Sequence, residues 1–142
     1  MKRKILAVLA AVTLAASPAY ADTETEMRYE RDTYLLAHLI AGECQCYSRK
    51  CQLYTGSVVL NRVASSHYPD TIEKVIFQKG QYACTWDGNF DREPTATNWE
   101  VAEYLMENGS QLPADVIYQS RAKQGKYVYD KVDGEYFCGG YK

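Results

Sequence analysis

Residues 35–62 constrain the fold more than any other part of the chain, because two apolar helical patterns flank a short cysteine-bounded loop there. The first pattern places apolar residues at helical spacing on one face: Leu35, Leu36, Leu39 and Ile40. It predicts a helix that begins near Glu30 or Asp32 and whose regular run ends or loosens at Gly42. The second pattern predicts a helix over about residues 51–65.

Within the second helix, Gly56 has a low helix propensity, so we expect it to allow close packing of another backbone. Residues 71–77 are typical of a short amphipathic helix with three inward residues: Ile72, Val75 and Ile76. Residues 80–94 are rich in glycine and aromatic residues and are predicted to be irregular. A third helix is predicted from Thr97 or Asn98, either of which can cap it, to the residue before Gly109.

The C-terminal part predicts a small β element. Residues 116–119, 127–130 and 136–138 have the short apolar and aromatic composition of strands. Asp133-Gly134 is a common two-residue hairpin turn. The pattern as a whole predicts a mainly helical α+β fold.

The N-terminus is typical of a signal peptide over residues 1–21. Lys2-Arg3-Lys4 precede an apolar run over 5–16, and Ala19-Tyr20-Ala21 fits a cleavage site. The apolar run is shorter than the ~20 residues of a membrane span. We therefore expect an exported chain that begins at Asp22, has a frayed polar start over 22–27, and forms one domain over 22–142.

The net charge of the chain restricts the classes of macromolecule that it can bind. Removing residues 1–21, which hold three basic and no acidic residues, changes the net charge from −2 to −5. An acidic domain disfavours nucleic acid. We expect a monomer that does not insert stably into a membrane.

Five cysteines remain in the mature chain, and export favours disulfides. The spacing suggests pairs Cys46–Cys51 and Cys84–Cys138, with Cys44 unpaired. Other pairings stay open, because sequence alone does not fix connectivity.

Glu43 is the first candidate catalytic residue, because it ends the first apolar helix. A carboxylic acid that protonates a glycosidic oxygen needs apolar surroundings, and Ile40, Ala41, Gly42 and Cys44 are its neighbours. The plain alternative is a solvated surface charge. Two other sites compete: a zinc site of Cys44, Cys46 and Cys51 with His38, and a thiol nucleophile with His38 or His67 as its base. We expect no cofactor and no metal.

Aromatic residues suggest a sugar-binding cleft, because saccharide rings stack on Tyr and Trp faces. The candidate substrate-binding residues are Gln81, Tyr82, Trp86, Tyr118 and Phe137. The alternative for Trp86 and Phe137 is a place in the core.

Several pieces together resemble the SleB-type cell wall hydrolases, which include spore-cortex lytic enzymes: LLAHLIAGE, GSVVLNRV, YPDTIEKVIFQKGQYACTWDG, PADVIYQS and YFC. The resemblance implies a lysozyme-like domain that cleaves the glycan strands of peptidoglycan, with Glu43 as its acid. It favours lytic transglycosylation, which needs one carboxylate, over hydrolysis, for which Asp87 or Asp91 would be the second. A non-catalytic peptidoglycan-binding protein and a thiol amidase remain rivals. Cys44 departs from the alanine common in the family.

Overall fold

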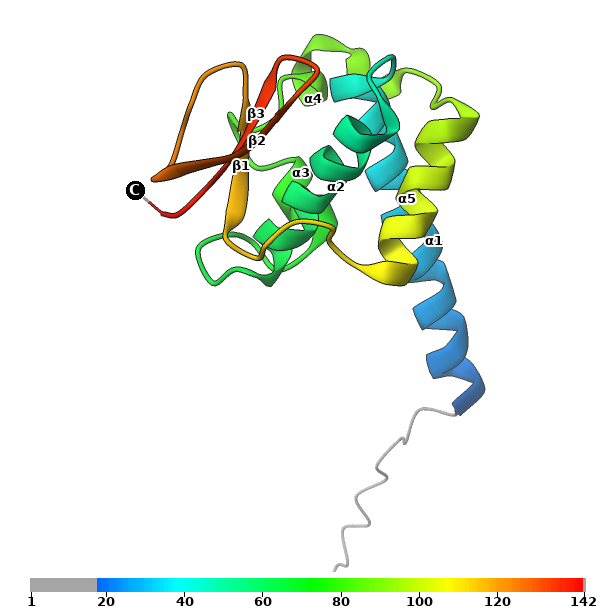
Figure 1. Cartoon of the computed structure of the whole chain (residues 1–142). Coiled ribbons are helices and arrows are strands. Elements are labelled where there is room, and N and C mark those ends of the chain that lie inside the picture. The colour runs from blue at the N-terminus through cyan, green and yellow to red at the C-terminus, as the bar shows by residue number, and fades with distance from the viewer. Residues whose placement is uncertain (1–17, 142) are drawn as a thin grey trace, which may run out of the picture.

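The computed structural model describes residues 18–141, so most of the predicted signal peptide, residues 1–17, lies outside the described part (Figure 1). The helices are α1 (Pro18–Cys44), α2 (Arg49–Ala64), α3 (Ile72–Ile76), α4 (Cys84–Asp87), the 3-10 helix η1 (Asn89–Asp91) and α5 (Ala96–Asn108). The strands are β1 (Val116–Ser120), β2 (Tyr127–Val132) and β3 (Glu135–Gly139). The mainly helical α+β prediction is confirmed. Within residues 18–141, no helix combines the length and apolar character that crossing a membrane requires.

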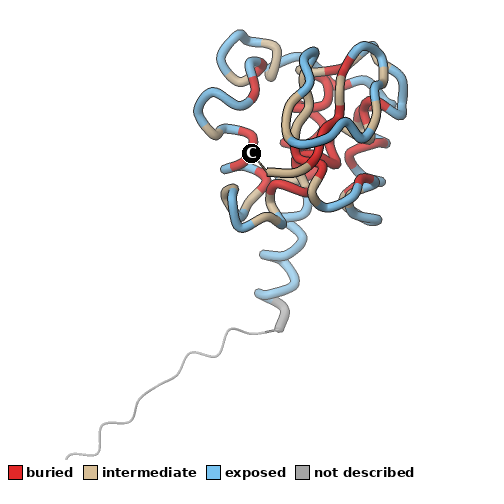
Figure 2. The backbone as a smooth tube through the Cα atoms, turned by 60° about the vertical axis from the view of Figure 1, so that its left-hand side comes forward, coloured by how far each residue is buried: buried red, intermediate tan, exposed pale blue. Residues whose placement is uncertain are grey.

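Helix α1 is the central element and is longer than predicted. Its second half is buried from Leu35 to Ala41, whereas its first half projects from the body as an exposed helix (Figure 2). The predicted frayed segment 22–27 is instead helical. Glu24, Glu26 and Met27 in that segment are good helix formers, so it extends the helix without tertiary packing.

The prediction that Gly42 ends or loosens α1 is also wrong, because the helix continues to Cys44. A Cβ at Gly42 would lie 2.8 Å from Cys84 Cβ and 3.3 Å from the Asn89 carbonyl oxygen. Glycine is needed here for the close approach of α4 and η1.

Helices α2 and α5 pack on α1. At Gly56, a Cβ would lie 2.4 Å from Leu105 Cδ1, so this glycine accommodates a side chain of α5 rather than a backbone. The cap of α5 is Thr95, two or three residues earlier than the predicted cap at Thr97 or Asn98. Thr95 Oγ1 accepts from Asn98 N, and Asn98 Oδ1 accepts from Thr95 N, which is a capping box. The Asn98 amide then donates to Gln52 Oε1 at 2.8 Å in the core.

The shorter elements mostly follow the prediction. Helix α3 buries its three expected residues, Ile72, Val75 and Ile76. Residues 80–94 are more regular than predicted, since they contain α4 and η1.

The three strands form an antiparallel sheet with order β1-β3-β2. The hairpin turn at Asp133-Gly134 is confirmed: both residues have positive φ, 52° and 87°, as a two-residue turn requires. The sheet is tied to α2 from β1, because Asn61 Nδ2 donates to the Val116 carbonyl at 2.9 Å and Arg62 Nε to the Ile117 carbonyl at 2.9 Å.

Neither predicted disulfide is present, and all five cysteines are free thiols. Cys46 is exposed in the turn after α1, whereas Cys51 is buried in the first turn of α2, with its Sγ 3.9 Å from the Val132 carbonyl oxygen. Cys84 packs against Gly42 instead of reaching Cys138, which is buried in β3.

Candidate active site

Glu43 occupies the last turn of α1. Ile40 and Ala41, just before it, are fully buried, and Cys44, just after it, is 3 % exposed. The Glu43 side chain itself is half-buried. Helix α1 therefore brings a carboxyl group from the apolar core to the surface, and the apolar neighbours expected from the sequence are present.

The Cys84 thiol is in hydrogen-bond contact with the Glu43 carboxyl group. Burial is the main cause that raises the pKa of Cys84, and the charge of Glu43 raises it further. Cys84 therefore remains a neutral thiol that donates its proton toward Glu43. Because Gly42 lets α4 approach α1, the glycine and the cysteine together fix one side of the carboxyl group.

A second carboxyl group, Glu135, lies near enough to Glu43 for the charge of Glu43 to affect its pKa, and sequence reasoning missed it. Burial raises the pKa of Glu135, the positive charge of Arg121 lowers it, and the charge of Glu43 raises it again. Arg121 Nε lies 3.4 Å from Glu135 Oε1. Asp87 and Asp91, the predicted second carboxylates, are both exposed.

The β2–β3 turn places Glu135 there. Asp133 Oδ2 accepts hydrogen bonds from Ser48 N at 2.8 Å and from Ser48 Oγ at 2.6 Å. Ser48 is also the cap of α2, because its Oγ accepts from Cys51 N. These bonds dock the hairpin on the loop that follows Glu43. The sequence signal was the Asp-Gly turn directly before Glu135, but which surface it docks on is a tertiary property.

Arg62 is another residue that sequence reasoning missed. It is buried in α2, and its guanidinium carbon lies 5.1 Å from the ring centre of Tyr68 and 5.2 Å from that of Tyr82. Its Nη1 donates to Gln81 Oε1 at 3.3 Å. Arg62 thus contacts and orients two of the predicted site residues, Gln81 and Tyr82. The available sequence signal was its position: Arg62 follows the apolar residues Val58 to Leu60 of α2, where a charged side chain is unusual.

The predicted substrate-binding residues divide into two groups. Gln81 and Trp86 are exposed, Trp86 by 62 %, and Tyr118 is half-buried. Phe137 is fully buried and packs edge-on against Tyr54, so it belongs to the core, and its assignment to a cleft wall is wrong.

Tyr82 is only 5 % exposed, so its ring cannot stack on a sugar either. Its hydroxyl is buried without a hydrogen-bond partner in the described residues. Burial raises the pKa of Tyr82 to about 12, and the charge of Glu43 contributes to the rise. The hydroxyl therefore stays neutral beside the site.

The competing sites find no support. Among residues 18–141, no group of three His, Cys, Asp or Glu side chains could hold a metal ion. His38 is buried and donates from Nδ1 to the Phe90 carbonyl, and His67 stacks on Tyr141. The raised pKa values of Cys44 and Cys84 make both thiols poor nucleophiles.

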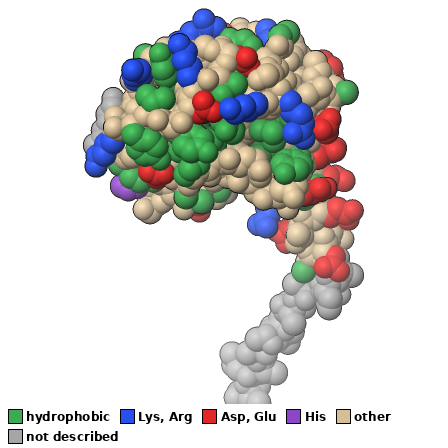
Figure 3. Space-filling view, in the orientation of Figure 1, with side chains coloured by type: hydrophobic (Ala, Val, Ile, Leu, Met, Phe, Trp, Pro, Cys, Tyr) green, Lys and Arg blue, Asp and Glu red, His purple; other side chains and the backbone are tan. Residues whose placement is uncertain are grey.

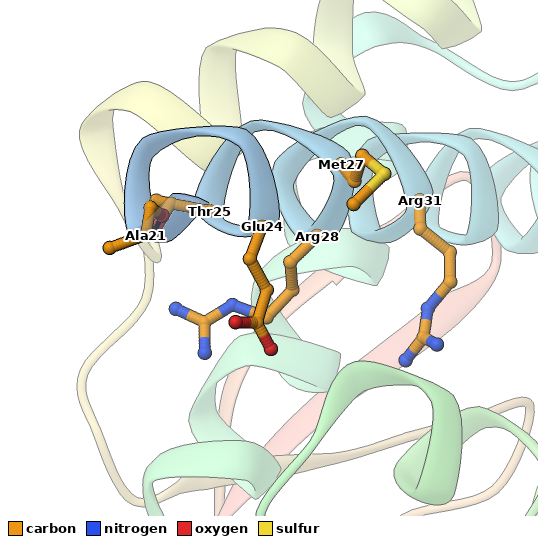
Figure 4. A pocket seen from close by; sticks show the side chains of 6 residues that line it. All are labelled: Ala21, Glu24, Thr25, Met27, Arg28 and Arg31. Atoms are coloured by element: carbon orange, nitrogen blue, oxygen red, sulfur yellow. Dashed lines mark hydrogen bonds between the residues drawn. The ribbon is translucent and has the colours of Figure 1, made fainter. Parts of the chain in front are cut away.

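A surface hollow lies away from Glu43, on the exposed half of α1. It has a volume of about 560 Å³ and is lined by Ala21, Glu24, Thr25, Met27, Arg28 and Arg31 (Figure 4). The lining residues all belong to this one helix, and Ala21 belongs to the predicted signal peptide, so we assign the hollow no role.

In Figure 3, acidic side chains gather along the side formed by α1 and α5.

Comparison with known proteins gives a family and a fold. The model of the family described as Cell Wall Hydrolase matches residues 47–134, a range that begins four residues after Glu43. A spore cortex-lytic enzyme of Oceanobacillus iheyensis is 32 % identical over 91 residues, which cover 63 % of this chain and 32 % of that protein. One from Bacillus cereus is 31 % identical over 68 residues, 48 % of this chain and 26 % of that protein. The chain thus spans about a third or less of these relatives.

Two solved structures share the fold. The catalytic domain of Bacillus cereus SleB superposes with a TM-score of 0.67 at 22 % identity, covering 77 % of this chain and 90 % of that one. The catalytic domain of the germination-specific lytic transglycosylase SleB from Bacillus anthracis gives 0.66 at 21 % identity, covering 77 % and 94 %. The lysozyme-like fold expected from the sequence is confirmed.

Proposed function

Since this chain belongs to the cell wall hydrolase family, we propose that it cleaves the glycan strands of peptidoglycan and that Glu43 is its general acid. One observation carries the assignment of the acid. Glu43 is a half-buried carboxyl group at the end of a buried helix, with the Cys84 thiol and the Glu135 carboxyl group as its polar neighbours. A general acid has to reach the substrate and yet sit beside apolar surroundings, and the end of α1 offers both to Glu43.

The reaction we propose is lytic transglycosylation. Protonated Glu43 gives its proton to the oxygen that links N-acetylmuramic acid to N-acetylglucosamine. That bond breaks, and positive charge develops at C1 of the muramic residue. The C6 hydroxyl of the same residue attacks C1, and ionised Glu43 takes the hydroxyl proton. The products are a 1,6-anhydro end and a free N-acetylglucosamine end, and Glu43 is protonated again.

Glu135 favours a second candidate, hydrolysis of the same bond. An inverting hydrolase uses one carboxylic acid and one carboxylate that activates water. The charge of Glu43 raises the pKa of Glu135, so Glu135 is near enough to be the candidate base. The two reactions differ in their products: an anhydro end in one case, a reducing end in the other.

The substrate contacts that we propose are Gln81, Trp86 and Tyr118. The exposed Trp86 ring is available for stacking on a saccharide, and the Gln81 amide is oriented by Arg62. Titration of Glu43→Gln with soluble glycan fragments should quench tryptophan fluorescence. Replacing Trp86 in that background should remove most of the quenching and leave the Trp99 signal. Unchanged quenching would place the saccharide elsewhere.

We also propose that the chain is exported and processed after Ala21. Cleavage there would remove the first four residues of α1 and leave 121 residues. The intact mass of protein from the culture medium or envelope of an expressing cell would test this. A mass that retains residues 1–21 would contradict processing at Ala21.

The activity test compares wild type with Glu43→Gln on purified vegetative wall and on spore cortex. We expect wild type to release soluble glycan fragments and the variant to lose about 10²–10⁴-fold in rate while still pelleting with the wall. Glu100→Gln, on the exposed side of α5, is a matched control and should keep full activity. A Glu43→Gln protein as active as wild type would refute the assignment. Wild type that binds without turnover would favour the non-catalytic binding module.

A thiol amidase is tested in the same assay. Iodoacetamide should leave a glycosidase active, whereas it would inactivate an enzyme that uses a cysteine to cut the peptide stem.

A further inference from the structure

Cys44 and Cys51 form a buried thiol pair at the junction of α1 and α2, and the proposed reaction does not use it. Cys44 is the last residue of α1 and is 3 % exposed, and Cys51 lies in the first turn of α2 and is fully buried. Cys44 Sγ contacts Thr55 Oγ1 at 3.5 Å. Thr55 lies one helical turn after Cys51, on the same face of α2. The face of α2 that carries Cys51 is therefore turned toward Cys44.

The Cys51 thiol is also close enough to Cys44 to affect the pKa of Cys44, while Cys51 Sγ itself lies 3.9 Å from the Val132 carbonyl oxygen. A side-chain hydrogen bond with Cys51 is the largest cause that raises the pKa of Cys44, followed by burial. Both residues belong to the main hydrophobic cluster. The other three cysteines are placed differently: Cys46 is exposed, Cys84 contacts Glu43, and Cys138 is in β3.

From this arrangement we propose that Cys44 and Cys51 form a disulfide bond when the chain folds in the presence of a disulfide oxidant. One cysteine thiolate attacks the oxidant disulfide, forms a mixed disulfide and releases one thiol. The second cysteine thiolate then attacks the sulfur of the first, which closes the bond and releases the second thiol. Two protons leave the cysteines, and two electrons reduce the oxidant to two thiols.

The bond would join the end of α1 to the start of α2, one residue after Glu43. Its formation belongs to folding, because the folded protein buries both sulfurs and a raised pKa leaves Cys44 with little thiolate. Reduced native protein should therefore oxidise at least tenfold more slowly than protein that refolds in the same oxidant.

Peptide mapping tests the pairing without relying on activity, so it stands or falls separately from the assignment of Glu43. Full-length protein is refolded in mixed reduced and oxidised glutathione, alkylated with iodoacetamide and digested with trypsin without reduction. Trypsin cuts after Arg49 and Lys50, so peptides 32–49 and 51–62 should appear joined. Reduction should separate them.

Variants assign the sulfurs, because peptide 32–49 contains both Cys44 and Cys46. The Cys46→Ala protein should keep the joined peptides, and the Cys44→Ala protein should lose them. Loss of the link in Cys46→Ala, or full alkylation of Cys44 and Cys51 in refolded wild type, would overturn the proposal.

Thermal unfolding gives an independent readout. Closing this short loop should raise the Tm of the oxidised Cys46→Ala protein by about 5–10 °C over its reduced form. An equal or lower Tm would mean that the native fold does not accommodate the bond, and would also overturn the proposal.

Discussion

Replacing Asn61 by alanine tests the physical connection between the helices and the sheet. Asn61 is 5 % exposed, and its Nδ2 donates to the Pro113 carbonyl at 2.8 Å and to the Val116 carbonyl at 2.9 Å. These bonds hold the start of β1 on α2. Asn61→Ala removes both donors and leaves the two carbonyls in place.

The two lost hydrogen bonds differ in how much free energy of unfolding each contributes. The Pro113 carbonyl also accepts from Val116 N at 2.9 Å, so it loses one of two bonds, at about 1 kcal/mol. The Val116 bond is buried, and leaving its acceptor without this donor costs about 1–3 kcal/mol. The free energy of unfolding should therefore fall by about 2–4 kcal/mol. That is a large share of the 5–15 kcal/mol of a typical domain.

Urea denaturation of the mature domain measures this change, with Asn108→Ala as the control. Asn108 is exposed and its Nδ2 donates to Tyr104 O within α5, so its replacement should change stability by less than about 0.5 kcal/mol. We expect an unchanged denaturant slope and a lower midpoint for Asn61→Ala. A loss no larger than that of the control would refute the account of how the sheet is held.

Three further predictions concern packing and pH. Gly56→Ala gains about 1 kcal/mol of helix propensity but drives a methyl group against the fully packed Leu105 at 2.4 Å, so we expect a net loss of up to about 2 kcal/mol, measured by urea denaturation; a net gain would show that Leu105 moves freely. The pKa of Glu135 is raised, which means that its ionisation opposes folding as pH rises above the usual carboxyl range, even with Arg121 nearby. Glu135→Gln should therefore raise Tm at pH 7 and show little gain near pH 4, and equal gains at both values would contradict this. The pKa of Asp133 is lowered by its bonds to the cap residue of α2, so Asp133→Asn should lower Tm at pH 7 and match wild type once acid has protonated the carboxylate; a difference that persists in acid would rule out the charge as its cause.

Much of the helical framework could be predicted, because the spacing of apolar residues along the sequence indicates it locally. The buried stripe over 35–40, the inward residues of α3 and the Asp-Gly turn each express a short-range preference. Errors at the ends have equally local causes. Thr95 competes with Thr97 as a cap, and only the reciprocal bond with Asn98 decides between them.

The rest depends on contacts between distant segments. Gly42 has the composition of a helix stop, but the approach of Cys84 gives it a packing role inside the helix. The Asp-Gly turn before Glu135 is a local signal for the hairpin, but Glu135 approaches Glu43 only when that hairpin docks on Ser48. The prediction of a Cys46–Cys51 disulfide was wrong for the same reason. Helix α1 continues through Cys44, which leaves Cys46 on the surface while Cys51 is buried.

The soluble products of peptidoglycan digestion test the central claim most directly. Purified mature protein and Glu43→Gln are incubated with peptidoglycan, and the released fragments are identified by mass spectrometry. We predict 1,6-anhydro-muropeptides from wild type and none from the variant. Reducing-end muropeptides would contradict transglycosylation and make Glu135 the first residue to replace, and identical fragments from both proteins would contradict Glu43 as the acid.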